Sequence, residues 1–359
     1  MDACFRAIKG KTDTLGPDDP STLKSMAYLG IIYRPMEKLE EAKEIGTHVL
    51  ERRRAVLGNE HPDTLISMSY AATAYRALGD YESAAKLEAE KLKGWTKLYG
   101  PSHPQSLDAL ALVGWAYACQ GKYAEAEKLM SHSLAVQIET RATHWFTFWT
   151  MHSFSALLGM QGKYFEAEEL TEQALDFRTQ YMGLSHPYRY ISLLYLAWLY
   201  NETGRYGEAE TIELEVLEFN QKFYEGDTHH DVLLTRSQLA STYSYMSRHA
   251  EAYAIKTAVY DIRLKTKGEI HPATLRCKSS LGATLTSLSR LFEAETLLTS
   301  ARDLQKIHLG HEHPETLTTL SRLAVLYERQ CRLHEAADLF VDVLAASERV
   351  LGEKHPRTR

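Results

Sequence analysis

Residues 57–64 read L-G-N-E-H-P-D-T, and close copies of this stretch recur along the whole chain. The copies include M-G-L-S-H-P-Y-R at 182–189, L-G-H-E-H-P-E-T at 309–316 and L-G-E-K-H-P-R-T at 351–358. The proline position is occupied in turn by Pro20, Pro62, Pro104, Trp145, Pro187, His230, Pro272, Pro314 and Pro356. The successive intervals are 42, 42, 41, 42, 43, 42, 42 and 42 residues, which identifies an internal repeat.

Each repeat unit has the pattern of two amphipathic helices. After the proline, small and apolar residues return three and four positions apart, as in T-L-I-S-M-S-Y-A-A-T-A-Y-R-A-L-G-D-Y at 64–81. A glycine that is typical of a helix end then precedes a Y-x-E-A-E segment, as in G-R-Y-G-E-A-E at 204–210. Ser247, Ser289 and Cys331 replace this glycine in units 6 to 8. A second helix ends at a Leu-Gly or Tyr-Gly turn, so each unit is predicted to be a hairpin of helix A and helix B.

The pattern L-A-x-x-Y-x-x-x-G-x-Y-x-E-A-E, nearly complete from Leu196 to Glu210, resembles the tetratricopeptide repeat. The 42-residue period and the L-G-x-x-H-P-x-T-L linker are similar to the repeats of kinesin light chains and of related arrays in fungal signalling proteins. The resemblance implies an all-α fold, an α-solenoid that forms a right-handed superhelix of about eight helix-turn-helix units. The hairpins are predicted at 20–58, 62–100, 104–141, 145–183, 187–225, 230–268, 272–310 and 314–352.

The organisation that follows is one repeat domain with incomplete units at both ends. Residues 1–16 align with a helix B that lacks its partner, residues 17–352 form a single superhelical domain, and residues 353–359 begin a ninth unit. Natural arrays end in polar capping elements, and neither end looks like one, so we expect the chain to be a segment of a longer array or of a longer protein.

The charge and composition of the chain argue against nucleic acid and membrane lipid as partners. Net charge is −6 over 359 residues, and no basic stripe of the kind that binds nucleic acid is present. Arg52-Arg53-Arg54 is the densest basic run, and we interpret it as a solvated helix face. The sequence contains no run of about 18 apolar residues, so it predicts no membrane span. The four cysteines are far apart in sequence and suit a reducing compartment, which indicates a cytoplasmic protein.

In the family that the repeats resemble, helix A lines the concave surface. The resemblance implies that positions two, five, nine, twelve and thirteen after the threonine slot (Thr64 in unit 2) face inward, and these positions share one helical face. We call them the inward stripe. The candidate groove residues are Arg76, Trp115, Trp149, His152, Ile191, Leu194, Trp198, Asn201 and Tyr245. In units 7 and 8 the stripe is polar and contains Arg276, Ser279, Thr286, Ser287, Thr318, Ser321, Glu328 and Arg329.

Three of the five tryptophans fall on the stripe in units 3 to 5, namely Trp115, Trp149 and Trp198. They predict an aromatic anchor for a ligand. The alternative is that each indole folds against the neighbouring helix A, since large aromatic side chains are usually well buried. The stripe positions separate the aromatic-rich stretch 143–154 into two groups. Trp149 and His152 fall on the stripe, whereas Phe148, Met151 and Phe154 fall on positions that pack between helices, and we expect them in the core.

Catalytic and metal-binding motifs are not evident. Half of the 16 histidines, including His61, His103 and His186, precede the proline position, where they recur with the turn and are a full repeat apart, too far for one metal site. The sequence contains no phosphate-binding loop, no G-x-S-x-G and no H-E-x-x-H, so no metal and no cofactor is expected. One constellation favours acid–base chemistry: His152 on the stripe, with Asp108 and Glu202 in the units on either side.

Two functions follow. The first is a non-catalytic scaffold that binds a peptide or partner segment in the groove, with the indoles as anchor. The alternative is a small apolar molecule, or an enzyme, using the pocket around Trp115, Trp149, His152 and Trp198; exposed indoles also favour self-association. One departure from the family concerns the asparagine pair that holds a peptide backbone in kinesin light chains. Here the corresponding positions read Ser69-Tyr70, Ala111-Leu112 and Leu194-Tyr195, which weakens the case for cargo-type recognition.

Overall fold

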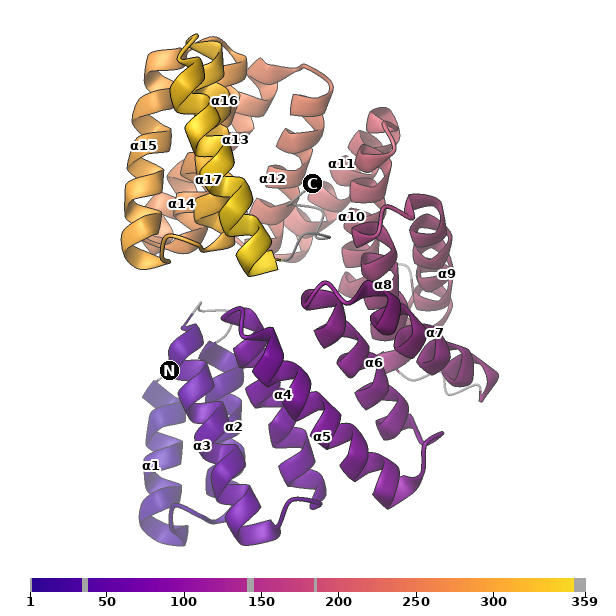
Figure 1. Cartoon of the computed structure of the whole chain (residues 1–359). Coiled ribbons are helices and arrows are strands. Elements are labelled where there is room, and N and C mark those ends of the chain that lie inside the picture. The colour runs from indigo at the N-terminus through magenta and orange to yellow at the C-terminus, as the bar shows by residue number, and fades with distance from the viewer. Residues whose placement is uncertain (1, 34–37, 141–144, 184–185, 352–359) are drawn as a thin grey trace. The chain divides into compact units, whose positions relative to one another are not determined.

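The computed structural model describes residues 2–33, 38–140, 145–183 and 186–351, and all seventeen elements in these ranges are α-helices (Figure 1). The chain divides into two compact units, Met1–Gln161 and Gly162–Arg359. From here on, unit 1 and unit 2 denote these two parts of the chain, whereas units 3 to 8 still denote repeats. Unit 1 contains α1 (Asp2–Leu15), α2 (Pro20–Tyr33), α3 (Leu39–Leu57), α4 (Pro62–Ala77), α5 (Tyr81–Tyr99), α6 (Pro104–Cys119), α7 (Tyr123–Glu139) and α8 (Trp145–Met160). Unit 2 contains α9 (Tyr164–Met182), α10 (Pro187–Glu202), α11 (Tyr206–Phe223), α12 (His230–Tyr245), α13 (His249–Lys267), α14 (Pro272–Ser287), α15 (Leu291–His308), α16 (Pro314–Arg329) and α17 (Leu333–Leu351).

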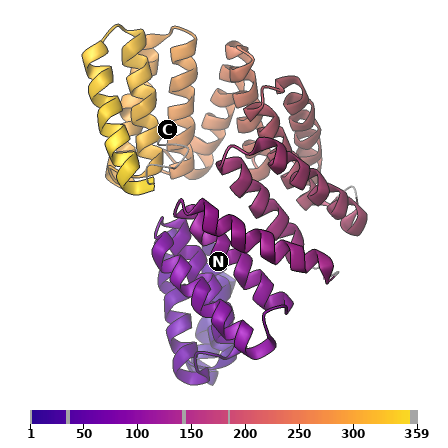
Figure 2. The ribbon, with the colours of Figure 1, turned by 45° about the vertical axis from the view of Figure 1, so that its right-hand side comes forward.

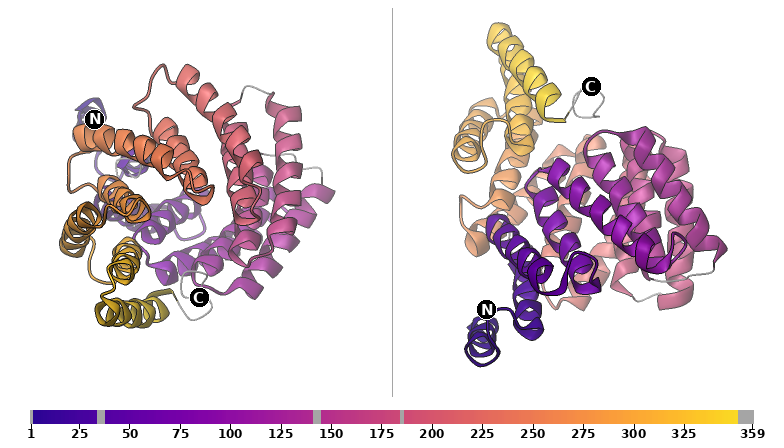
Figure 3. Two further views of the ribbon diagram at one scale, coloured as in Figure 1. Left: turned by 90° about the horizontal axis from the view of Figure 1, so that it is seen from above. Right: turned by 60° about the horizontal axis from the view of Figure 1, so that its bottom comes forward.

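Within each unit, consecutive helices pack as antiparallel hairpins that follow one another in chain order (Figures 2 and 3). The even-numbered helices from α2 to α16 begin at the proline position of each repeat, as the sequence predicts. The all-helical repeat fold is therefore confirmed. The expected start of a ninth unit at 353–359 lies outside the described residues.

The histidine before the proline position caps the helix that follows. In six repeats the side-chain Nδ1 of this histidine accepts a hydrogen bond of 3.2–3.3 Å from the backbone N–H two residues later. The six are His61, His103, His186, His229, His271 and His313. An accepting Nδ1 carries no proton, so the cap requires the neutral imidazole. The recurrence of histidine at this position is thereby explained by helix capping.

The turn between helix A and helix B requires a left-handed residue. Gly79, Gly121, Gly162 and Gly204 take this conformation with φ between 76° and 84°. Ser247, Ser289 and Cys331 hold φ at 60°, 60° and 63° in units 6 to 8. The turn geometry is thus kept where glycine is lost, at a cost of roughly 1–2 kcal/mol for each residue with a Cβ.

Helices A and B approach closely at one small residue in each hairpin. The residue ten positions after the proline slot is buried in every repeat, and the set is Gly30, Ala72, Gly114, Ser155, Ala197, Ala240, Gly282 and Ala324. At Gly114 a Cβ atom would lie 2.6 Å from Cγ of Met130 on α7, well inside van der Waals contact. At Gly114, and likewise at Gly282, where a Cβ would lie 2.6 Å from Cγ of Leu298, the close approach of the two helices requires a glycine.

A buried arginine near the end of helix B ties three of the described hairpins to the next, and we call it the helix B clamp. Arg53 on α3 is only 5% exposed, and its Nη1 donates to the carbonyl oxygen of Asp63 (2.9 Å) and to Ser67 Oγ (2.8 Å). This corrects the interpretation of Arg52–Arg54 as a solvated face, because the middle arginine points into the hairpin interface. In unit 2, Arg178 and Arg263 donate in the same way to the carbonyl oxygens of Tyr188 (2.8 Å) and Ala273 (3.2 Å).

An arginine at the helix A–B turn forms a second connection between repeats, the arginine ladder. Arg205, Arg248 and Arg332 each lie over the ring of the tyrosine five residues earlier, at 3.8–3.9 Å from its centroid. Each also pairs with the glutamate three residues later, at 2.6–2.7 Å. Their second partners lie on helix B of the preceding repeat: Glu168 (2.5 Å), Glu210 (2.7 Å) and Glu295 (2.7 Å). The last glutamate of the Y-x-E-A-E segment thus joins one repeat to the next.

Candidate interaction site

The positions of the inward stripe differ in exposure. On α6, Asp108, Trp115 and Cys119 at positions two, nine and thirteen are half-buried, whereas Ala111 and Ala118 at positions five and twelve are fully buried. Positions two, nine and thirteen therefore form the accessible edge of helix A, and positions five and twelve lie closer to the seam between adjacent A helices.

Two predicted groove residues lie in that seam in unit 2. Leu194 packs with Leu193 and Val216 in a core cluster. Asn201 is 7% exposed, and its Nδ2 donates to Thr242 Oγ1 on α12 at 2.7 Å. Both side chains serve the packing of α10 against its neighbours, so they offer little surface to a ligand.

Trp115 lies at the junction of three helices in unit 1. Its ring packs against a cluster that contains Met130 of α7 and Leu157 of α8, yet the side chain is only half-buried. The indole thus has one face on the neighbouring helix and retains some exposed surface. Packing against the adjacent helix A, the alternative raised by the sequence, therefore accounts for only part of its surface.

The aromatic-rich stretch forms most of α8. Phe148 and Met151 are buried, as predicted, and Phe154 packs half-buried against the same cluster as Trp115. Trp149 is half-buried, with its ring 4.9 Å from that of Phe146, and His152 is half-buried one turn later on the same helix. Because α6 and α8 pack against each other, unit 1 presents two partly accessible indoles on adjacent A helices.

The carboxyl group of Asp108 lies on α6, the helix that also carries Trp115. Burial raises the pKa of Asp108 to about 7, and the charge of Lys91 only partly opposes this shift. Gln137 Nε2 donates to Asp108 Oδ1 at 3.4 Å, and Lys91 Nζ donates to Ser69 Oγ at 2.6 Å. Lys91 also pairs with the buried Glu88, so its charge is largely neutralised locally. Asp108 is therefore a carboxyl group that changes its protonation state near neutral pH.

Arg76, on the stripe of α4, is a second charged group of unit 1. It is half-buried, and its Nη1 has no hydrogen-bond partner among the described residues. Burial raises the pKa of the Cys119 thiol on α6, and the charge of Arg76 opposes that rise. This guanidinium thus has one buried donor that lacks a partner among the described residues.

In unit 2 the stripe of α10 and α12 carries a separate set of aromatic residues. Trp198 is half-buried between Tyr195 (5.3 Å between ring centroids) and the edge of Tyr164 (6.3 Å). The hydroxyl of Tyr164 donates to Glu202 Oε2 at 3.5 Å. Tyr245 stacks on Tyr206 at 5.7 Å and stays exposed, as does Ile191. Glu202 is thus occupied by a tyrosine of its own unit.

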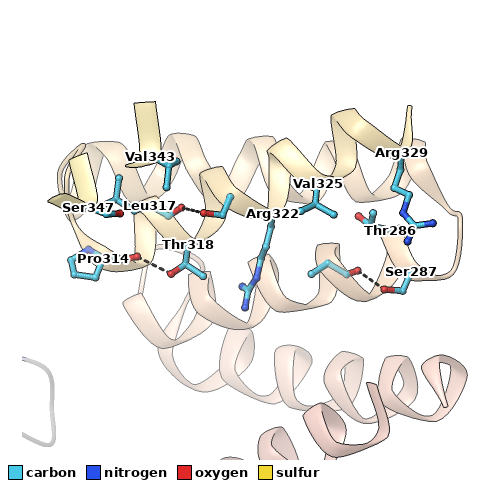
Figure 4. Close-up of a pocket in the computed structure, with 12 residues that line it drawn as sticks. Thr286, Ser287, Pro314, Leu317, Thr318, Arg322, Val325, Arg329, Val343 and Ser347 are labelled. Atoms are coloured by element: carbon cyan, nitrogen blue, oxygen red, sulfur yellow. Dashed lines mark hydrogen bonds between the residues drawn. The ribbon is translucent and has the colours of Figure 1, made fainter. Parts of the chain in front are cut away.

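A cavity of about 500 Å³ opens on the stripe of α14 and α16 and is closed on one side by α17 (Figure 4). Twelve residues line it: Ala283, Thr286, Ser287, Pro314, Leu317, Thr318, Ser321, Arg322, Val325, Arg329, Val343 and Ser347. The stripe rule places several of them inward from sequence, including Thr286, Ser321 and Arg329. The sequence did not single out this region as a site, because it lacks the aromatic residues that drew attention to units 3 to 5.

The described residues lack two kinds of feature. Among them, no group of three or more histidine, cysteine, aspartate or glutamate side chains is arranged to hold a metal ion. No helix among them combines the length and apolar character that crossing a bilayer requires.

The stacked hairpins define the class of protein, an all-α repeat protein built from helix-turn-helix units. The sequence model of the tetratricopeptide repeat family matches residues 21–90, 89–139, 146–222 and 273–349. The chain therefore belongs to the tetratricopeptide repeat family, whose members are generally non-enzymatic scaffolds for protein interactions. A comparison with the curated proteins finds no match.

Solved structures of similar fold include a Rap protein and a quorum sensor. A Rap protein complexed with Competence and Sporulation Factor has a TM-score of 0.62 and 11% identity, covering 99% of this chain and 98% of that one. The apo quorum sensor NprR of B. thuringiensis has a TM-score of 0.61 and 14% identity, covering 95% and 92%. A Podosopora anserina kinesin light chain with nearly identical repeats is 26% identical over 56% of this chain and 94% of that one, with a TM-score of 0.46. The first two likenesses establish the fold.

Proposed function

We propose that this protein is a non-catalytic scaffold that holds a peptide, or an extended segment of a partner protein, along the inward stripe of its A helices. The observation that carries the proposal is the pair Trp115 and Trp149. Both indoles are only half-buried, and they lie on helices α6 and α8, which pack against each other. Tryptophan is among the residues most often found at the energetic centre of protein interfaces.

The energetics favour this pair as an anchor. Apolar surface that a ligand covers contributes about 25 cal/mol per Å², and immobilising flexible side chains on binding opposes that gain. The two indoles are already held against Phe146 and the α6–α8 core, so little side-chain entropy remains to be lost when a partner binds.

Polar groups on the stripe of α4 and α6 supply orientation. The half-buried Arg76 carries a positive charge, and the half-buried Asp108 can donate or accept according to its protonation state. A peptide backbone presents both donors and acceptors, with which groups of these kinds can pair. In unit 2, Trp198, Ile191 and Tyr245 form the corresponding accessible set, and we assign them partner contacts within that unit.

A second candidate function is a small-molecule or acid–base site in unit 1. The observation that favours it is Asp108, because a carboxyl group with a pKa of about 7 suits proton transfer near neutral pH. His152 would serve as the second group. This candidate requires turnover that collapses in Asp108→Asn and in His152→Ala while the helical content of both variants stays unchanged.

The test is a selection of displayed random peptides on the full chain, followed by calorimetric titration of the best binder. Trp149→Ala should weaken binding by about 2 kcal/mol or more, as expected for a central aromatic anchor. Phe292→Ala is the matched control, because this aromatic residue is 83% exposed and lies off the stripe. Circular dichroism of each variant reports whether the fold is kept.

Two outcomes would oppose the scaffold proposal. One is a selected peptide that binds wild type and Trp149→Ala equally. The other is a set of small apolar compounds that shift tryptophan fluorescence in the wild type and not in Trp149→Ala, while no peptide is selected at all.

A further inference from the structure

The cavity between α14, α16 and α17 has an unbalanced charge. Of the twelve described residues that line it, two are arginines, Arg322 and Arg329, and none carries a carboxylate. Five others carry hydroxyl groups, but those of Ser287, Thr318 and Ser321 already donate to the carbonyl oxygens four residues earlier on their own helices (Figure 4). The strong hydrogen-bond donors of the cavity are therefore its two guanidinium groups.

The two arginines lie on the same face of α16. They are seven residues apart, with Val325 between them, and Figure 4 shows both side chains extending to the same side of the helix. Arg329 is exposed and makes no ion pair or hydrogen bond among the described residues. Arg322 is half-buried, and its Nη1 donates to Ser279 Oγ at 2.9 Å, which holds the side chain in place. One arginine is thus positioned by the protein and the other is available.

A second observation, independent of the cavity lining, is Lys256 on α13. Its Nζ donates to Ser244 Oγ (3.3 Å) and Thr284 Oγ1 (2.8 Å), and it pairs with no carboxylate among the described residues. Burial lowers the pKa of Lys256 to about 8, and the charge of Arg322 adds to the shift, while Cys277 opposes it. Lys256 is a half-buried cation whose pKa is lowered by the charge of Arg322, so positive charge is concentrated at this end of unit 2, which favours an anion there.

The rest of the lining is aliphatic. Leu317, Val325, Val343 and Ala283 contribute apolar surface from three helices. The volume of about 500 Å³ lies in the range of about 300–1,000 Å³ that is usual for ligand pockets. A ligand that matches the cavity has one anionic group for the arginines and a short aliphatic body for the apolar surface.

We propose that this cavity binds an aliphatic carboxylate, with the carboxylate on Arg322 and Arg329 and the aliphatic body against Leu317, Val325 and Val343. Two sources carry this chemistry. One is the C-terminal residue of a partner peptide with an aliphatic side chain, which rests on the scaffold function proposed above. The other is a free medium-chain carboxylic acid, which is independent of that function.

The experiment titrates the full chain calorimetrically with four probes. They are an acetylated hexapeptide that ends in leucine with a free carboxylate, the same peptide with a C-terminal amide, octanoate, and octanol. We expect the carboxylate form of at least one pair to bind about tenfold or more tightly than its neutral counterpart, as charge-assisted hydrogen bonds to arginine require. Preference within the peptide pair identifies a chain terminus, and preference within the octanoate pair identifies a free acid.

Variants locate the site. Arg329→Gln should weaken the preferred carboxylate about tenfold, and this exposed side chain has no structural contact to lose. Arg276→Gln is the matched control, since this exposed stripe arginine already pairs with Glu315 at 3.3 Å and does not line the cavity. Val325→Ser, at an exposed lining position, should weaken the same probe through its aliphatic part.

The proposal is overturned if neither carboxylate probe binds, if charged and neutral probes bind alike, or if Arg329→Gln and Arg276→Gln have equal effects. Trp149→Ala separates this site from the scaffold function. If Trp149→Ala still binds octanoate, the cavity site is supported whether or not this variant binds the peptides selected in the scaffold test. If the variant loses those peptides, the octanoate result still stands.

Discussion

Arg53 on α3 and Ser67 on α4 are joined across the boundary between two hairpins by a hydrogen bond of 2.8 Å from the guanidinium Nη1 to Oγ. The same guanidinium nitrogen also donates to the carbonyl oxygen of Asp63, at the start of α4. The buried charge is therefore held by two acceptors that belong to the next repeat, and it fixes the start of that repeat against the end of the previous one.

Replacing this arginine should loosen the junction. We expect Arg53→Met to lower the free energy of unfolding by about 2–3 kcal/mol, because the carbonyl and hydroxyl groups lose a charged donor in a buried site. Arg52→Gln is the control: Arg52 pairs with Asp18 at the surface, and such pairs contribute about 0–1 kcal/mol. Urea unfolding followed by circular dichroism measures both, and equal effects of the two substitutions would contradict a structural role for the clamp.

The left-handed turns of units 6 to 8 offer a gain in stability. Ser289→Gly removes a Cβ from a residue with φ of 60°, and we expect the free energy of unfolding to rise by about 0.5–1 kcal/mol after the added flexibility of the unfolded chain is subtracted. Gly204→Ser, with φ of 79° at the same position of unit 5, should lower it by a similar amount. Changes of the same sign in both variants would show that backbone strain is not what distinguishes these turns.

The cap that His313 provides makes stability depend on pH. Burial lowers the pKa of His313 below 6.5; Glu315 opposes the shift and Arg276 adds to it. The unfolded chain therefore binds the proton first, so the contribution of this cap is complete above pH 6.5 and is lost as pH falls through the folded pKa. We expect His313→Asn, which caps without titrating, to gain roughly 0.5–1 kcal/mol relative to the wild type between pH 7.5 and pH 5. A constant difference between the two proteins over this range would count against the neutral cap.

Asp108 has the opposite pH dependence. Because burial raises its pKa to about 7, the folded state retains a proton that the unfolded chain releases near pH 4. The contribution of this group to stability is complete below that lower value and declines as pH rises through about 7. Asp108→Asn should therefore be more stable than the wild type at pH 8, by about 1–2 kcal/mol, and similar to it at pH 4. A carboxyl ¹³C titration of the wild type checks the cause directly, and a midpoint near pH 4 would refute it.

The sequence predicted the repeat, the helix boundaries and the buried side of α8, because turn chemistry and helical period are local properties. It was wrong about Arg53, because a charged residue on a helix gives no sign of the carbonyl and hydroxyl groups that the next hairpin brings to it. Leu194 and Asn201 show a related limit: the stripe rule identifies a helix face, and only the packing of adjacent A helices separates its edge from its seam. The cavity beside Val325 could not be singled out, since it depends on the separation of α14, α16 and α17.

The arginine ladder has a consequence for how such a chain can change in length. Each arginine takes one partner from its own repeat, three residues later, and one from the repeat before it, 37 or 38 residues earlier, as Arg248 does with Glu251 and Glu210. Deletion or duplication of one whole period between equivalent turns recreates the same join at the new boundary. Insertions that shift a helix by part of a turn leave an arginine and a glutamate facing the wrong neighbours, so growth and loss by complete modules is a route that this architecture tolerates.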